Sequence, residues 1–193
     1  MKHTSILKFI TCFLFVLVVD TFGQALKPMH KLTKNQNKLV EEIAQNSTVR
    51  GKHGGTIALV PKQYSRFESL LEISSIDDLT FLLNHNSPAV RIYAFQGLLD
   101  TGNWQIALTE LTKHPRDTAT FYYRIGSMPG VHTASYFMRI RLNSYLENSR
   151  IILDSITKRK LDNLLNIVVS HEEEEFLAKK SNKLLKLNQQ QDN

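Results

Sequence analysis

The sequence predicts an all-α protein, an irregular α–α superhelix of helix hairpins that follows a cleaved signal peptide. Apolar residues recur at spacings of three and four through most of the chain after Pro61. Proline (5 residues) and glycine (8 residues) are scarce among 193 residues, which argues against a many-turned all-β fold. Hydrophobic residues make up 42% and charged residues 22%, as in a folded domain rather than a disordered or multi-pass membrane chain.

Residues 1–23 have the layout of a secretory signal. Three basic residues precede an apolar run of 11 residues, Phe9 to Val19, and small residues stand where cleavage after Gly23 is expected. The run is shorter than the roughly 18–20 residues of a membrane-spanning helix. An uncleaved anchor or a buried N-terminal helix is the alternative. Cys12 is the only cysteine and lies in this run, so the exported chain would have no thiol for a disulfide, a zinc ribbon or cysteine catalysis.

The rest of the chain divides into three parts. Residues 24–60 hold an N-terminal helix over 34–44 and a glycine-containing loop. The loop lacks the spacing of a phosphate-binding P-loop, so we interpret it as a flexible connection. Residues 61–187 form the helical domain, and residues 188–193 form a polar tail.

Helix boundaries in the first half of the helical domain are marked by residue type. Pro61 suits the first turn of a helix, and Ser74 or Ser75 suits the cap of the next one. Ser87 and Pro88 open a third helix, in which the small Gly97 would let a neighbouring helix approach closely. Thr101-Gly102 ends that helix, and a further helix covers 104–111.

The second half is less regular. Residues 118–125 are rich in β-formers but lie among helices, and we interpret them as an extended connection rather than a sheet strand. Helical spacing returns over 131–146. The last quarter predicts two more helices, one around 153–168 and one around 176–187.

Residues 76–102 resemble a HEAT-type repeat. The positions that carry the resemblance are Leu79, Leu82, Leu83, Pro88, Val90, Arg91, Ala94 and Leu98. A partial second copy follows 29 residues later, where Leu108, Leu111 and His114 correspond to Leu79, Leu82 and His85. The resemblance implies stacked antiparallel helix pairs that often bind other proteins. It also implies that Arg91 is a structural residue that ties the turn or a neighbouring hairpin.

No catalytic, cofactor-binding or metal motif stands out. The seven histidines include no i, i+4 pair, and the sequence has neither a zinc-protease nor a serine-hydrolase signature. The acidic run that follows His171 suits a helix N-terminus better than a metal site. The net charge of +6 is spread along the chain, which argues against nucleic-acid binding.

These observations predict an exported, non-catalytic binding or scaffold module whose partner is another protein. Arg91, Tyr93, Tyr122 and Arg124 are the candidate exposed contacts. The alternative is a small exported enzyme with an active site around His114, Asp117 and His132. A third possibility is a structural accessory whose C-terminal helix at 172–187 packs on another protein. The oligomeric state is left open.

Overall fold

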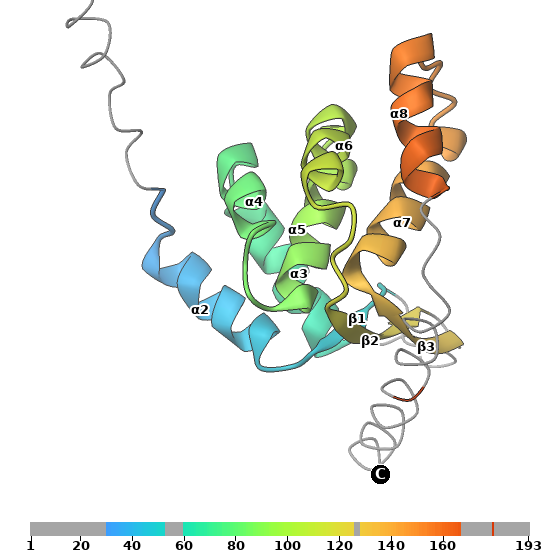
Figure 1. Cartoon of the computed structure of the whole chain (residues 1–193). Coiled ribbons are helices and arrows are strands. Elements are labelled where there is room, and N and C mark those ends of the chain that lie inside the picture. Colours follow the sequence, from blue (N-terminus) through green and yellow to red (C-terminus); the bar gives the residue numbers. More distant parts are fainter. Residues whose placement is uncertain (1–29, 53–59, 126–127, 167–178, 180–193) are drawn as a thin grey trace, which may run out of the picture. The chain divides into compact units, whose positions relative to one another are not determined.

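The computed structural model describes residues 30–52, 60–125, 128–166 and 179. In these ranges the chain is mainly helical, with a small three-stranded sheet (Figure 1). The elements belong to one unit that begins at Leu32. The mainly helical class is therefore confirmed, and the sheet was not predicted. The signal peptide, the glycine loop over 53–55, the helix around 176–187 and the polar tail lie outside the described residues.

Seven helices are described. They are α2 (Lys34–Ala44), α3 (Lys62–Glu72), α4 (Ile76–Leu82), α5 (Pro88–Asp100), α6 (Trp104–Lys113), α7 (Ala134–Asn148) and α8 (Ser155–Leu165). The helix expected over 34–44 has those same bounds, and Thr33 caps it by accepting from the amide of Gln36. None of the described helices is long and apolar enough to cross a membrane.

The predicted boundary residues stand at the helix ends, although Pro61 precedes the first residue of α3 and the Ser87 side chain makes no capping hydrogen bond. Ser75 and Asp78 form a reciprocal capping box at the start of α4, which satisfies amides that the helix itself leaves unpaired. Ser87 is the N-cap of α5 and Pro88 its first residue. Gly102 ends this region with a positive φ of 79°, a conformation that glycine adopts without steric cost.

Helix α5 is the centre of the core. It contacts α2, α3, α4, α6 and α7 as well as β1 and β2. Its side chains are buried nearly all round, as expected for a helix that is apolar on every face. Gly97 makes the close approach possible, because a Cβ atom there would lie 3.1 Å from Cδ1 of Leu71 and 3.2 Å from the Leu79 methyl groups.

The sheet joins segments that are far apart in the sequence. Strand β1 (Thr48–Arg50) runs parallel to β2 (Thr120–Ile125), and β2 pairs antiparallel with β3 (Met128–Thr133). Helices α3 to α6 form the crossover that a parallel pair requires. The interpretation of 118–125 as an extended connection is thus wrong. Thr133 caps α7, so the helix expected from 131 begins at Ala134.

Candidate functional site

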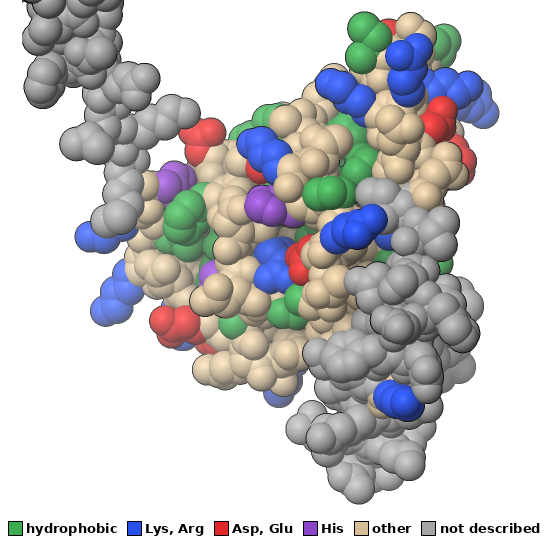
Figure 2. All heavy atoms as spheres, in the orientation of Figure 1, with side chains coloured by type: hydrophobic (Ala, Val, Ile, Leu, Met, Phe, Trp, Pro, Cys, Tyr) green, Lys and Arg blue, Asp and Glu red, His purple; other side chains and the backbone are tan. Residues whose placement is uncertain are grey.

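A cleft opens between the α4–α5 turn and the loop that follows α6. Its volume is about 590 Å³, within the range of small-ligand and side-chain pockets. Figure 2 shows histidine, basic and acidic side chains close together on this face of the molecule. We call this site the central cleft and define it by its lining residues, Leu83, Asn84, His85, Asn86, Arg91, Phe95, Glu110, Leu111, His114, Pro115, Arg116, Asp117, Ala119 and Met138.

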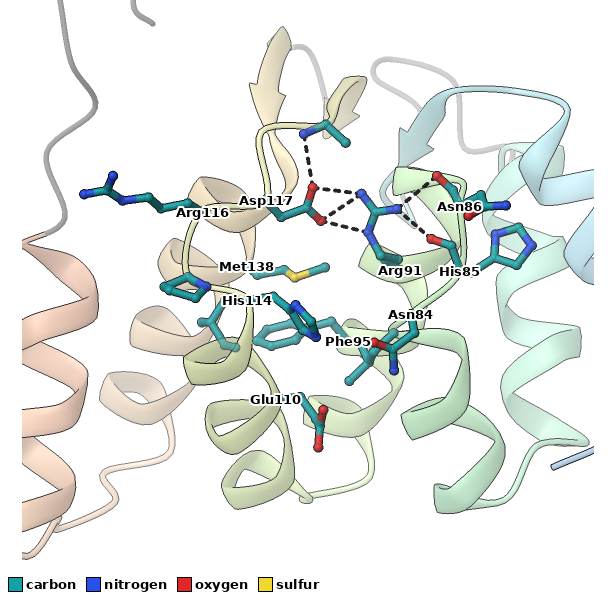
Figure 3. A pocket seen from close by; sticks show the side chains of 14 residues that line it. Asn84, His85, Asn86, Arg91, Phe95, Glu110, His114, Arg116, Asp117 and Met138 are labelled. Atoms are coloured by element: carbon teal, nitrogen blue, oxygen red, sulfur yellow. Dashed lines mark hydrogen bonds and ion pairs between the residues drawn. The ribbon is translucent and has the colours of Figure 1, made fainter. Parts of the chain in front are cut away.

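The floor of the central cleft is apolar and its rim is polar. Leu83, Phe95, Leu111 and Met138 come from four different helices or their ends and are all buried. At the rim, the ring of His114 is turned into the cleft beside Phe95, whereas Arg116 points away from it (Figure 3). An apolar floor with a few polar groups around it is the common composition of a binding pocket.

Arg91 and Asp117 close one end of the cleft. Nε of Arg91 donates to Oδ2 of Asp117 at 2.8 Å, and Nη2 donates to Oδ1 at 2.9 Å. Nη1 of Arg91 donates to the carbonyl oxygens of His85 at 2.6 Å and Asn86 at 3.0 Å. Arg91 therefore holds the α4–α5 turn to the loop after α6 and fixes the width of the cleft.

His85 serves the backbone rather than the cleft. Its Nδ1 accepts from the amide of Ser87 at 3.0 Å, so it stabilises the start of α5 instead of bonding helix-terminal carbonyls. Its ring points away from His114 (Figure 3). Burial, and then the charge of Arg91, lower the pKa of His85, which favours the neutral ring that this hydrogen bond needs.

The four candidate contact residues are less exposed than expected. Tyr93 and Tyr122 are 2% and 5% exposed, and the expectation of exposure is wrong for both because they pack in the interior. The Arg91 side chain is 12% exposed, and all three of its guanidinium nitrogens already donate to Asp117 or to the turn. Arg124 is half-buried on β2, opposite Arg50 of β1.

The three residues of the enzyme alternative do not meet. His114 and Asp117 line the central cleft, but His132 is not among its lining residues. His132 lies on β3 and stacks on the ring of Tyr123, with ring centroids 4.9 Å apart. The ring of Tyr136 also contacts His132, with centroids 4.8 Å apart. Asp117 is paired with Arg91, and no hydrogen bond joins it to His114 in the described part of the chain. The cleft therefore holds two of the three residues, and an active site around them stays a prediction.

Most of the residues that line the cleft were not predicted from the sequence. Asn84, Glu110 and Arg116 were not singled out, nor were Phe95 and Met138 as floor residues. One feature of the sequence could have located the cleft. His85 and His114 occupy equivalent positions 29 residues apart, and both lie at the ends of helices that border the same cleft.

The described residues contain no group of three or more histidine, cysteine, aspartate or glutamate side chains placed to hold a metal ion. No protein-family model, no curated protein and no solved structure matches this chain.

Proposed function

We propose that this chain is an exported, non-catalytic binding module that holds a protein partner at the central cleft. A short segment of the partner inserts an apolar side chain between Phe95 and Met138. The polar groups of Asn84, His114 and Glu110 contact its backbone or neighbouring polar groups. Shape and apolar complementarity supply the binding energy, and the Arg91–Asp117 pair keeps the cleft open in the free protein.

The observation that carries this proposal is the composition of the cleft. Its floor consists of buried apolar side chains from several helices, and its volume of about 590 Å³ is sufficient for a large side chain. Residues of a partner that fill such a pocket contribute a large share of the binding energy of protein interfaces. The charged pair Arg91–Asp117 at the cleft is already satisfied internally, which leaves apolar contact as the main attraction.

The stacked hairpins of the HEAT-like resemblance suit this role. Helices α4 and α5 form one pair and α6 and α7 the next, and contacts run from α4 to α5, from α5 to α6 and from α6 to α7. In such a stack, binding sites form where the ends of successive hairpins lie next to each other. The Arg91–Asp117 pair ties the α4–α5 turn to the loop after α6, which supports a structural role for Arg91.

Export follows from the signal-like residues 1–23. The mature protein would begin at Gln24, which intact-mass measurement of protein recovered from the medium or the cell envelope would test. A protein that retains Met1 would contradict this part of the proposal.

Binding at the cleft is tested by filling it. His114→Trp places an indole at the cleft directly after α6, and Gln105→Trp adds the same group at an exposed position of α6. Both proteins would be used as bait on a native envelope or medium fraction. We expect the unmodified protein and Gln105→Trp to capture the same partner in equal amounts. His114→Trp should not capture it. Equal capture by all three would overturn the proposal.

A further inference from the structure

A second cavity lies on another side of α5. It has a volume of about 280 Å³ and shares no lining residue with the central cleft. The end of β1, helix α3, helix α5 and helix α7 all contribute to it. Its polar lining residues are Arg50, Lys52, Tyr64, Tyr93, Gln96, Asp100 and Arg141.

The lining is positively charged. Arg50, Lys52 and Arg141 carry three positive charges, and Asp100 is the single acidic residue among the lining residues. Lys52 lies 3.8 Å from Glu68, which offsets part of this positive charge, and solvent screens the contact because the two side chains are 59% and 44% exposed. A small, partly open cavity with this balance of charge favours an anion.

Arg141 is held in a fixed orientation. Its Nε and Nη2 both donate to Oε1 of Gln96, at 2.9 and 2.6 Å. The amide nitrogen of Gln96 in turn donates to Oδ1 of Asp100 at 2.5 Å. The neutral amide of Gln96 therefore stands between the guanidinium and the carboxylate. In the part of the chain that the structure describes, no acid lies within ion-pair distance of Arg141.

One edge of this guanidinium remains open. The side edge, formed by Nε and Nη2, is occupied by Gln96. The end edge, formed by Nη1 and Nη2, presents two nearly parallel N–H donors, and no described residue accepts a hydrogen bond from Nη1. Nη1 is not a buried atom without a partner, so it is accessible to solvent, and Arg141 lines the cavity. Two parallel donors on a planar cation match the two oxygens of a carboxylate.

We propose that this cavity binds a small carboxylate, which the end edge of Arg141 holds through two parallel hydrogen bonds. The ring of Tyr64 and the apolar side chains of Ile92 and Phe137 contact the rest of the ligand. Lys52 at the mouth attracts the anion. The carboxylate belongs either to a free organic acid or to the C-terminus of a peptide, because both present the same group to Arg141.

The test is an NMR titration of the full mature chain. Propionate and benzoate are the probes, and propionamide and benzamide are their neutral controls. We expect saturable chemical-shift changes of the backbone N–H signals near Gly51, Gln96 and Arg141 when propionate or benzoate is added. Propionamide and benzamide should cause no such changes. Equal shifts with acids and amides, or shifts confined to the central cleft, would overturn the proposal.

Substitutions of Arg141 test its role in binding the carboxylate. Arg141→Gln should weaken acid binding at least about tenfold, since charge-assisted hydrogen bonds to the carboxylate are lost. Arg141→Lys keeps the charge but not the two parallel donors, and should also bind more weakly. Arg159→Gln removes an exposed arginine on α8 and should bind as the unmodified protein does. Unchanged affinity in Arg141→Gln and Arg141→Lys would contradict the site.

Trialanine with a free or an amidated C-terminus distinguishes the two sources. Tighter binding of the free peptide than of propionate would identify a peptide C-terminus, and equal or weaker binding would identify a free acid. A far-UV circular dichroism spectrum and a melting curve of each variant establish that it is folded. If Arg141→Gln does not fold, Arg141→Lys and Lys52→Gln carry the test, and full acid affinity in both would overturn the proposal.

Discussion

The guanidinium of Arg91 donates two hydrogen bonds, of 2.8 and 2.9 Å, to the carboxylate of Asp117, which lies 26 residues further along the chain. Both side chains are largely buried, at 12% and 20% exposed. Asp117 also accepts from the amide of Ala119, which fixes the loop that leads into β2. This contact links the turn between α4 and α5 to the opposite wall of the central cleft.

Breaking this contact should destabilise the protein. We expect Arg91→Ala or Asp117→Ala to lower the free energy of unfolding by about 2 kcal/mol, because each leaves the other charge partly buried and unpaired. Urea unfolding of the two single variants and the double variant would give a coupling energy of at least ~1 kcal/mol.

Glu110 and Lys113 supply the matched comparison. Lys113 Nζ lies 2.6 Å from Oε1 of Glu110, but the lysine side chain is 57% exposed. The same cycle on this pair should give a coupling energy of about 0.5 kcal/mol or less. Equal coupling energies for the two pairs would argue against a structural role for Arg91.

Tyr93 joins helix α5 to strand β1. Its hydroxyl accepts from the amide of Arg50 at 2.7 Å and donates to the carbonyl of the same residue at 3.0 Å. Burial raises the pKa of Tyr93, so the hydroxyl stays protonated and can donate. Tyr93→Phe should cost about 1–2 kcal/mol in urea unfolding, because it leaves two backbone groups of Arg50 without this partner. No loss of stability would show that water replaces the hydroxyl.

Gly130 leaves room for a ring stack on the sheet. A Cβ atom at this position would lie 2.6 Å from the hydroxyl oxygen of Tyr123 and closer still to Cε1. Gly130→Ala should therefore push the Tyr123 ring off His132 and lower the free energy of unfolding by about 2 kcal/mol. In a Tyr123→Ala background the same change should cost much less. An equal decrease in the free energy of unfolding in the unmodified protein and in Tyr123→Ala would show that Gly130→Ala does not act through the Tyr123 ring.

Stability should fall as the pH decreases from 7.5 to 5.5. Burial, followed for His85 by the charge of Arg91, lowers the pKa of both His85 and His132 below the usual value. The unfolded chain then binds protons more readily than the folded one, so stability is complete above the unfolded pKa near 6.5 and is lost below it. Thermal melts over this range would measure the slope, and His132→Phe should reduce it. A melting temperature that rises on acidification would contradict this assignment.

Local sequence signals were sufficient to predict most helices. The capping box of Ser75 and Asp78, the proline at the start of α5 and the glycine after it depend only on neighbouring residues. The sheet could not be predicted in this way. Strand β1 has three residues, and its partner Tyr122–Arg124 lies more than 70 positions away, so pairing depends on the packing of the helices between them.

The site was predicted only in part for a similar reason. Arg91 and Asp117 were both singled out, but for different roles, because their pairing depends on how successive hairpins pack. Tyr93 was named as an exposed contact although its helical spacing places it on the same apolar face as Val90 and Ala94, and the structure buries all three. The periodic pattern was therefore the better guide to this residue than its amphipathic chemistry.

The most direct measurement is site-specific photo-crosslinking from the rim of the central cleft. A benzoylphenylalanine at Asn84, an exposed rim residue, reports on the cleft, and the same group at exposed Gln105 of α6 reports on a surface outside its lining. Our account predicts a discrete crosslinked partner from position 84 and none from position 105. A partner crosslinked from 105 and not from 84 would contradict it.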